Sequence, residues 1–269
     1  MKKNHSLLWG CFWLVFWLVG CSTSVEEKPP HTKGFHKNTL KIANWNLQLF
    51  GQSKAKKPDL MQFYASVLDD YDIVFIQEIR DKSGTAFPQL CAMLPGYHHL
   101  VSSRAGRSNT KEQYGILYKE GIQAVLEDFN LNPQNRWERP PVKVTFTAGD
   151  YIFSVYNIHT DPDDVKNELQ ALQDVVVNQG NVIIMGDLNA DCAYYNPTKE
   201  TEFDLWHWAI GDTLDTTVSN TNCAYDRIIL NDEVQEEFVQ AGVFKEGITA
   251  PISDHYLIWM TLSLREVGN

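Results

Sequence analysis

The sequence lacks an excess of positive charge. Its 269 residues include 23 lysines and arginines against 34 aspartates and glutamates, so the formal net charge is −11. Such a balance is unfavourable for non-specific binding to nucleic acids, and it argues against a clamp that holds DNA through many ionic contacts. It does not exclude a nuclease, because a bound metal ion and a few arginines can outweigh the average field at one site.

The sequence also lacks a comfortable membrane span, internal repeats and low-complexity tracts. The apolar run from Leu7 through Val19 is too short to cross a bilayer comfortably. No second linker interrupts the chain after residue 37, and 43% of the residues are hydrophobic, which is enough for an ordinary packed core. The length allows one large domain or two small ones, and we expect a single domain over residues 38–269.

The N-terminus has the pattern of an export signal. Lys2 and Lys3 precede the apolar run, which ends in Leu-Val-Gly-Cys at 18–21. This ending resembles a bacterial lipobox. We therefore expect residues 1–20 to be a lipoprotein signal peptide and Cys21 to carry the lipid; the alternatives are a plain secretory peptide and a short anchor helix.

The residues after Cys21 suggest where such a lipoprotein would go. The residue after Cys21 is Ser22 and not an aspartate. By resemblance to sorting patterns in Gram-negative bacteria, this favours the outer membrane. Residues 22–37 are rich in Ser, Thr, Glu, Lys and Pro without periodicity. We expect residues 21–37 to form a flexible tether between lipid and domain.

Apolar periodicity and turn residues predict strands and helices that intermingle along the chain, so we expect a mixed sheet arrangement. The predicted strands are Leu40–Asn46, Ile73–Gln77, His98–Ser102, Tyr114–Tyr118, Val142–Phe146, Tyr151–Ile158, Asn181–Gly186, Asp226–Leu230 and Tyr256–Leu264. The predicted helices are Pro58–Leu68, Ala86–Met93, Asp163–Val177 and Glu202–Ala209. For the third helix we expect Asp161 as N-cap, Pro162 at the first helical position and Gly180 just after the end.

The most informative segment is Met-Gly-Asp-Leu-Asn-Ala-Asp-Cys at 185–192, which directly follows a β-branched strand. Asp187 and Asn189 are two positions apart, so on an extended chain they point to the same side. One acidic acceptor and one neutral donor there suit a phosphate oxygen beside a hard metal ion. Taken alone, the segment could also be an ordinary turn.

Other predicted strands end or begin with polar residues of the same kind. Asn46 ends one apolar strand and Glu78 follows another, and Glu78 offers the hard oxygen ligand that Mg²⁺ prefers, although it could be a surface residue. His159 follows a third strand and could equally be a structural histidine. Asp226 begins a strand, and the adjacent Asp254 and His255 precede the last one.

Cysteine is scarce, with five residues in all. If Cys11 leaves with the signal and Cys21 carries lipid, three remain. An exported protein retains disulfides, and Cys192 and Cys223 each lie beside a proposed catalytic segment, so we expect them to pair. The bond would contribute roughly 3–4 kcal/mol. We expect Cys91 to be a buried, inert thiol.

Six polar segments at strand ends, in this order, resemble the endonuclease/exonuclease/phosphatase superfamily and, within it, the deoxyribonuclease I family. The resemblance runs from about Leu40 to Leu264. It is most specific at Ile-Gln-Glu-Ile-Arg-Asp (76–81), the 185–192 segment, Thr-Asn-Cys-Ala-Tyr-Asp-Arg-Ile (221–228) and Ile-Ser-Asp-His-Tyr (252–256). It implies an α+β fold with two packed mixed sheets in a four-layer α/β/β/α sandwich.

The resemblance also implies a metal-dependent phosphodiester hydrolysis that leaves a 5′-phosphate and a 3′-hydroxyl. Glu78 would be the main ligand of Mg²⁺ or Mn²⁺, with Asn46 and Asp254 nearby. His159 and His255 would be the acid/base pair around the scissile phosphate. A carboxylate beside an imidazole fixes its tautomer and raises its pKa, which suits acid/base work near neutral pH.

The supporting roles are likewise implied by the resemblance. Glu112 would orient the first histidine and Asp226 the second. Asp187 and Asn189 would hold the phosphate and the attacking water.

DNA contacts are implied for two arginines, with departures from the family pattern nearby. Arg80 and Arg139 would touch the DNA backbone or minor groove. A DNA-contacting tyrosine of the family is replaced by Thr110, which removes a flat surface for a sugar. Leu257 stands where proline is usual, and this should affect the entry to the strand more than the chemistry.

A structural calcium loop of the family matches alternate residues of one segment. The matching residues are Asp215, Thr217, Ser219 and Thr221. Their oxygens suit Ca²⁺, although the segment could be only a polar turn. A second calcium loop of the family has no counterpart in residues 128–133, and we expect it to be absent.

Three functions compete. The first is a lipid-anchored endodeoxyribonuclease that acts as a monomer on double-stranded DNA with little sequence preference. The second keeps the chemistry but acts on a lipid or inositol phosphate, or serves as a nuclease-like toxin subunit, because one fold can host several substrates. The third is a non-catalytic binding domain. The retention of every catalytic position argues against the third.

Overall fold

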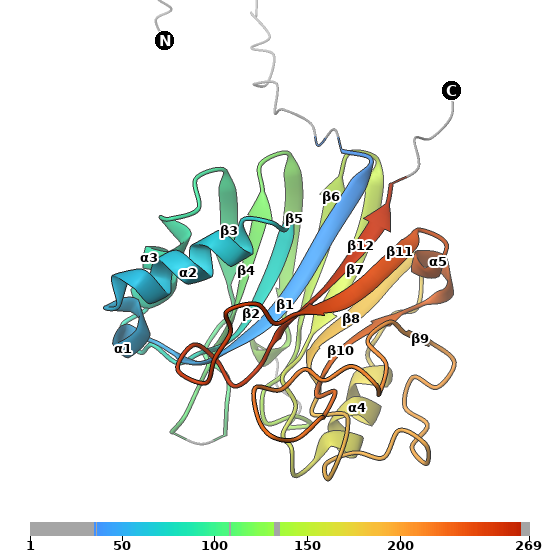
Figure 1. Cartoon of the computed structure of the whole chain (residues 1–269). Helices are drawn as coiled ribbons and strands as arrows, with labels where there is room; N and C mark the ends of the chain where they lie inside the picture. Colours follow the sequence, from blue (N-terminus) through green and yellow to red (C-terminus); the bar gives the residue numbers. More distant parts are fainter. Residues whose placement is uncertain (1–34, 36, 108, 132–134, 265–269) are drawn as a thin grey trace, which may run out of the picture. The chain divides into compact units, whose positions relative to one another are not determined.

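The computed structural model describes residue 35 and residues 37–107, 109–131 and 135–264, and Figure 1 shows two mixed six-stranded sheets packed face to face. The first sheet contains, in spatial order, β11 (Phe238–Phe244), β12 (Leu257–Ser263), β1 (Thr39–Phe50), β2 (Ile73–Ile79), β4 (Gln113–Lys119) and β3 (Tyr97–Val101). The second contains β5 (Ile122–Asp128), β6 (Val142–Ala148), β7 (Tyr151–Asn157), β8 (Asn181–Asp187), β10 (Asp226–Leu230) and β9 (His207–Trp208).

Helices cover the outer faces of the two sheets. On the first sheet lie α1 (Gln52–Ala55), α2 (Pro58–Leu68) and α3 (Ala86–Cys91), and on the second lies α4 (Val165–Gln173). The short α5 (Asp232–Gln235) follows β10, and a 3₁₀ turn spans Phe129–Leu131. The predicted four-layer α/β/β/α sandwich is confirmed.

The alternation of side chains along the strands explains why both faces of each sheet are apolar. In β2, Ile73 and Phe75 face the opposite sheet, whereas Val74 and Ile76 pack under the helices. Successive side chains of a strand point to opposite faces, so a strand covered on both sides reads as a continuous apolar run. Such runs made the central strands predictable.

Two parallel strand pairs bring their carboxyl ends to one edge of the sandwich. β1 pairs in parallel with β2 and β7 with β8, and the remaining pairs are antiparallel. In register, Asn46 lies beside Gln77, and Asn157 lies beside Met185. The polar ends of four strands therefore reach the same edge.

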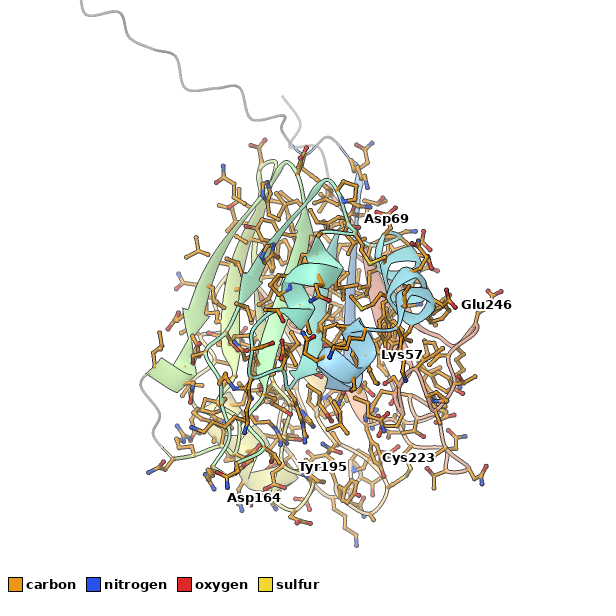
Figure 2. All side chains as sticks on the ribbon, turned by 90° about the vertical axis from the view of Figure 1, so that its left-hand side faces the viewer. Lys57, Asp69, Asp164, Tyr195, Cys223 and Glu246 are labelled. Carbon is orange, nitrogen blue, oxygen red and sulfur yellow. A yellow bond between two sulfur atoms is a disulfide. The ribbon has the colours of Figure 1, made fainter. Side chains whose placement is uncertain are left out.

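The polar strand ends lie at one end of the domain, far from the start of β2. Figure 2 shows Tyr195 and Cys223 at one end and Asp69 at the other. Asp69 precedes the start of β2, and Glu78 lies at the far end of that strand. The edge with the polar strand ends is thus about 20 Å along β2 from the region of Asp69.

All nine predicted strands and the predicted helix Pro58–Leu68 are present, with small differences at most ends. The predicted helix Glu202–Ala209 is wrong. Phe203 has a left-handed backbone (φ 56°), and its amide donates to the side chain of Gln173. His207 and Trp208 pair with β10 as a short edge strand. Tertiary anchoring of these aromatic residues outweighs the local helical pattern.

Helix α4 corresponds to the predicted helix Asp163–Val177 but is shorter, and its predicted N-cap is wrong. The N-cap is Asp164 rather than Asp161, whose carboxylate accepts instead from the amide of Asp163. The helix ends at Gln173, so Gly180 (φ 70°) lies in the turn before β8 and not at the helix end. Strands β5 and β11, at the edges of their sheets, were not predicted.

The signal peptide, the lipid-bearing Cys21 and nearly all of the predicted tether lie outside the described residues. Within the described residues, no helix is both long and apolar enough to span a membrane.

Candidate active site

The predicted polar residues meet at the shared edge of the two sheets. Asn46 at β1 of the first sheet donates through Nδ2 to Glu78 Oε1 (3.3 Å) and to Asp187 Oδ2 (3.1 Å) on β8 of the second sheet. Asp226 lies opposite Asp187 in the antiparallel register of β10 and β8. One side chain of the first sheet thus bridges an acid of its own sheet and an acid of the other.

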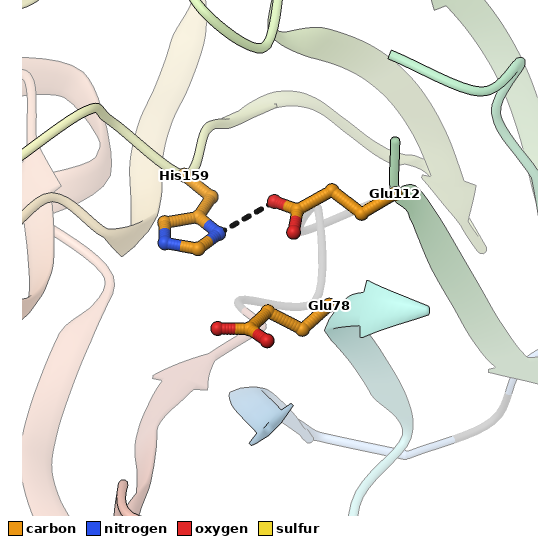
Figure 3. A group of neighbouring side chains, drawn as sticks. All are labelled: Glu78, Glu112 and His159. Carbon is orange, nitrogen blue, oxygen red and sulfur yellow. Dashed lines mark hydrogen bonds and ion pairs between the residues drawn. The ribbon is translucent and has the colours of Figure 1, made fainter. Parts of the chain in front are cut away.

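His159 and Glu112 form the first imidazole–carboxylate pair. Nδ1 of His159 lies 2.7 Å from Oε1 of Glu112 (Figure 3), and both residues are buried. Burial alone would lower the pKa of His159, but the charge of Glu112 outweighs it and the pKa is raised. Burial alone would raise the pKa of Glu112, and the positive groups around it bring that pKa below the usual value instead.

Two arginines also contact the carboxylate of Glu112. Arg80 Nε lies 3.3 Å from Glu112 Oε2 and 3.4 Å from Glu78 Oε2, and Arg139 Nε lies 3.1 Å from Glu112 Oε1. Arg139 also donates to the carbonyl of His159 (2.8 Å), and its side chain is 13% exposed. Both arginines therefore neutralise the acidic cluster, and their contact with DNA stays a prediction.

His255 and Asp226 form the second pair. Nδ1 of His255 lies 2.7 Å from Oδ2 of Asp226, which is completely buried. Burial opposes the charge on His255, but Asp226 and Asp187 together raise its pKa well above the usual value. Burial likewise raises the pKa of Asp226 to about 6, against the opposing effect of His255. The backbone carbonyl of His255 is fixed by the indole of Trp45 (2.9 Å).

Asp187 lies between the two pairs. Its Oδ2 is 3.3 Å from Nε2 of His159 and 3.4 Å from Nε2 of His255. Burial would raise the pKa of Asp187, but the two imidazoles and Asn46 lower it. Two imidazole nitrogens thus converge on one point from opposite carboxylate-bound rings.

Two site residues have left-handed backbones. Glu78 (φ 60°) lies where the register of β2 with β4 shifts, so a bulge interrupts the alternation that would otherwise send its side chain under the helices. Asn189 (φ 47°) donates through Nδ2 to the carbonyl of Thr160 (3.1 Å). Positive φ in residues other than glycine costs energy and is concentrated at functional sites.

Oxygen donors suited to a hard cation are present. Acceptor or donor atoms of Glu78, Glu112 and His159 lie within 4.8 Å of one another, and those of Asp187, Asp226 and His255 form a second such group. Asp254 Oδ1 is buried without a hydrogen-bond partner. A carboxylate oxygen that makes no hydrogen bond and lies 3.8 Å from Nε2 of His255 fits a metal ligand.

Lys54 was missed because the sequence around it reads as a solvated lysine-rich turn. Its Nζ is buried and donates to the carbonyls of Leu47 and Ile252, each at 2.7 Å. Burial lowers the pKa of Lys54 to about 8, opposed by the charges of Asp254 and Glu78. Lys54, on α1, therefore ties β1 to the loop that precedes His255.

The predicted disulfide is confirmed. Cys192 and Cys223 are bonded, and the bond closes a loop with a sequence separation of 31. Cys91 is a half-buried free thiol, and burial raises its pKa to about 12, in keeping with an inert role.

The predicted calcium-loop residues lie together. Asp215 Oδ1 accepts from the amide (3.1 Å) and hydroxyl (3.0 Å) of Thr217, and that hydroxyl lies 3.2 Å from the hydroxyl of Ser219. Ser219 also bonds the side chain of Thr221. Lys245 approaches Asp215 at 3.3 Å. Their binding of calcium stays a prediction, as does the absence of the second calcium loop.

Residues 43–255 match the Endonuclease/Exonuclease/phosphatase family. The chain is 31% identical over 260 residues to Deoxyribonuclease-1 of Sus scrofa, covering 83% of this chain and 92% of the relative. It is 32% identical over 263 residues to Deoxyribonuclease-1 of Gallus gallus, covering 84% and 93% respectively.

A solved structure shares the fold at lower identity. It is the mannosyl-6-phosphatase of Bacteroides thetaiotaomicron, with a TM-score of 0.57, 15% identity and coverage of 82% of this chain and 98% of that one. At this identity the likeness concerns the fold alone.

Proposed function

We propose that this chain, which belongs to the endonuclease/exonuclease/phosphatase family, is a metal-dependent endonuclease that leaves 5′-phosphate and 3′-hydroxyl ends on DNA. It is a deoxyribonuclease-like phosphodiesterase by its similarity to Deoxyribonuclease-1 over more than four-fifths of its length. The observation that carries the proposal is the convergence of two imidazole–carboxylate pairs, whose Nε2 atoms lie 3.3 and 3.4 Å from one oxygen of Asp187.

Two such pairs suit an in-line displacement at phosphorus. One imidazole takes a proton from the attacking water, and the other gives a proton to the departing 3′ oxygen. Glu112 and Asp226 each accept the Nδ1 proton of a histidine, so both rings present Nε2 to the substrate. Because both carboxylates raise the histidine pKa values, a proton is available near neutral pH.

The remaining polar groups would position the phosphate. Asn189, held by the carbonyl of Thr160, and Asp187, held by Asn46, would orient the phosphate and the water. Arg80, which is 28% exposed, and Arg139 would meet the DNA backbone while keeping Glu112 ionised. This arrangement allows a chain of net charge −11 to bind a polyanion locally.

Glu78, Asn46 and Asp254 would hold the divalent cation, Mg²⁺ or Mn²⁺. The ion would stabilise the negative charge that grows on the phosphate oxygens. The fit rests on the donor chemistry and on Asp254 Oδ1, a buried atom without a hydrogen-bond partner. Lys54 lies near both acids but is already bonded to two backbone carbonyls.

The decisive test is nicking of supercoiled plasmid by purified residues 22–269, with Mg²⁺ and then with EDTA. We expect nicking that EDTA abolishes and that His159→Ala and His255→Ala each reduce by about 100-fold or more. His98→Ala is the matched control, since this histidine is exposed on β3 at the edge of the first sheet.

Undiminished nicking by both active-site variants would refute the assigned chemistry. End-labelling of the products should find 5′-phosphates. Hydrolysis of an inositol phosphate or lipid phosphodiester without any DNA nicking would instead favour the alternative substrate class.

We also propose export and lipid anchoring through Cys21. The disulfide between Cys192 and Cys223 supports export, because such bonds persist in oxidising compartments. Mass spectrometry of the membrane fraction should find a mature N-terminus at Cys21 carrying lipid. An unmodified N-terminus elsewhere would contradict the anchor.

A calcium site at the loop that contains Asp215, Thr217, Ser219 and Thr221 is a further part of the proposal. The clustering of their oxygens supports it. Calcium there would brace the loop that precedes Cys223, and it would act on stability more than on the chemical step.

A further inference from the structure

Three buried amides form a closed ring between the two sheets, directly beneath the candidate active site. Asn44 Nδ2 donates to Gln77 Oε1 (3.3 Å), Gln77 Nε2 donates to Asn157 Oδ1 (3.2 Å), and Asn157 Nδ2 donates to Asn44 Oδ1 (2.8 Å). All three residues are 0% exposed. Asn44 and Gln77 belong to the first sheet and Asn157 to the second, so the ring crosses the interface.

Gln77 has one donor and one acceptor position that the ring does not use, and both bond to the backbone of segments that carry site residues. Gln77 Nε2 also donates to the carbonyl of Ile158 (2.8 Å), the residue before His159. Gln77 Oε1 also accepts from the amide of Asp187 (2.9 Å). Both protons and both acceptor positions of Gln77 are therefore occupied, two within the ring and two on segments that carry site residues.

The packing around Gln77 leaves no room for a side chain at position 186. A Cβ on Gly186 would lie 2.0 Å from the carbonyl oxygen of Ile158 and 2.7 Å from Nε2 of Gln77. Gly186 also has a φ of 150°, a conformation that other residues rarely adopt. The amide of Gln77 thus reaches the second sheet only because position 186 has no side chain.

A merely structural role would be met more simply by apolar side chains, which form a large buried cluster between the sheets. Apolar contact is non-directional and fixes the relative position of two sheets only loosely. A fully satisfied amide ring is directional, and breaking one member leaves buried groups without partners. The ring therefore sets how Asn46 and Glu78 on one sheet lie relative to Asp187 and His159 on the other.

We propose that the ring of Asn44, Gln77 and Asn157 positions the two halves of the active site, with Gln77 as its central positioning residue. The inference rests on the proposed phosphodiesterase activity. None of the three side chains touches substrate; Gln77 acts through the backbone of Ile158 and Asp187. Its loss should slow the chemical step while leaving DNA binding intact.

The test is steady-state nicking of plasmid by Gln77→Met, which keeps the length of the side chain and removes its polar atoms. We expect kcat to fall about 10- to 100-fold while KM stays within about twofold, because a misplacement of about 1 Å at reacting groups can cost about 100-fold in rate and a smaller one costs less. Assays are run well below the unfolding midpoint of every variant.

Asn231→Ala is the matched control, because it removes an equally buried amide that is bonded away from the site. Asn231 accepts from the amides of Val182 and Val234 and donates to the carbonyl of Gly180. We expect it to lower the unfolding midpoint by a similar amount and to leave kcat within about twofold of wild type. Equal kcat values for the two variants would overturn the positioning role.

If Gln77→Met does not fold, Asn44→Ala carries the test. It opens the ring but keeps the contacts of Gln77 with Ile158 and Asp187, so we expect a smaller fall in kcat, about three- to tenfold, with KM unchanged. An unchanged kcat would overturn the inference. Wild-type protein that fails to nick DNA would refute the proposed function itself, and the two failures are therefore distinguishable.

Discussion

Replacing Asp226 by asparagine tests the electrostatic role of the second imidazole–carboxylate pair. Asp226 is completely buried, and its Oδ2 lies 2.7 Å from Nδ1 of His255. Asparagine has the same shape, and its carbonyl can still accept the Nδ1 proton. The substitution therefore removes a charge and leaves a hydrogen bond.

The magnitude follows from that difference. A hydrogen bond to a charged partner contributes about 1.5–3 kcal/mol, and a neutral one about 0.5–1.5 kcal/mol. The loss of about 1–2 kcal/mol corresponds to a fall of about one unit in the pKa of His255. In wild type the negative charges of Asp226 and Asp187 raise that pKa well above its usual value, so the limb of the pH–rate profile that follows His255 should move about one unit toward acid in Asp226→Asn.

The loss of the Asp226 charge should also change how the free energy of unfolding depends on pH. A histidine whose pKa is raised on folding contributes stability that is fully present below its unfolded pKa, about 6.5, and is lost as the pH rises through the folded value. Asp226→Asn should therefore destabilise the protein more at pH 6 than at strongly alkaline pH. Urea unfolding at both pH values measures this.

The control is Asp72→Asn, which removes another buried carboxylate. Asp72 accepts from the amide of Lys41 (3.0 Å) and lies just before β2, whereas Glu78 lies near that strand's other end. We expect its pH–rate profile to overlay that of wild type. An unshifted profile in Asp226→Asn, with nicking as fast as in wild type from pH 5 to 9, would refute the reasoning.

Four further outcomes are expected. The carboxylate of Asp81 accepts from three amides and one hydroxyl of residues 83–86, and these bonds lower its pKa against the effect of burial; Asp81→Asn should cost about 1–3 kcal/mol above pH 4 and progressively less in acid, as urea unfolding would show. Reduction of the Cys192–Cys223 bond, or serine at both positions, should cost about 3–4 kcal/mol and roughly 10 °C in unfolding midpoint. Gly186→Ala should yield little folded protein, because its Cβ would lie 2.0 Å from a backbone carbonyl; normal expression and an unchanged midpoint would be contrary evidence. Millimolar Ca²⁺ should raise the midpoint of wild type but not of Asp215→Ala, and no shift in wild type would remove that site.

The polar strand ends of the candidate site could be predicted because both the burial of each strand and the polar residues at its end are visible in a short stretch of sequence. In β8, an uninterrupted apolar run from Val182 to Met185 ends in Asp187, and such a run is typical of a strand covered on both faces. Parallel neighbours deliver their ends to one edge, so acids at several strand ends indicate one site. The pairing of His159 with Glu112 over 47 positions, by contrast, came only from the family resemblance.

Two edge strands, β5 and β11, could not be predicted for the opposite reason. β5 buries Ile122 but leaves Val125 70% exposed, and β11 contains Gly242 and is half-exposed along most of its length. A strand covered on one face gives only a weak alternating pattern when some of its outward residues are apolar. Lys54 escaped prediction because burial of its ammonium depends on two carbonyls contributed by segments about 200 positions apart.

The amide ring escaped prediction although the sequence contains a signal for it. In three strands the side chains that face the other sheet alternate with those that face the helices, and the inward series reads Ile42 then Asn44, Phe75 then Gln77, and Val155 then Asn157. An amide that continues an inward apolar series cannot reach water, so it must find partners across the interface. Gln77 would then be expected to bond with Asn44, its neighbour on the same sheet, and with an inward amide of the other sheet, and Asn157 is one. An Asn or Gln at an inward-facing position of an apolar strand is therefore a physical signal for a group that fixes one sheet against another. The signal depends only on the alternation of side chains along each strand.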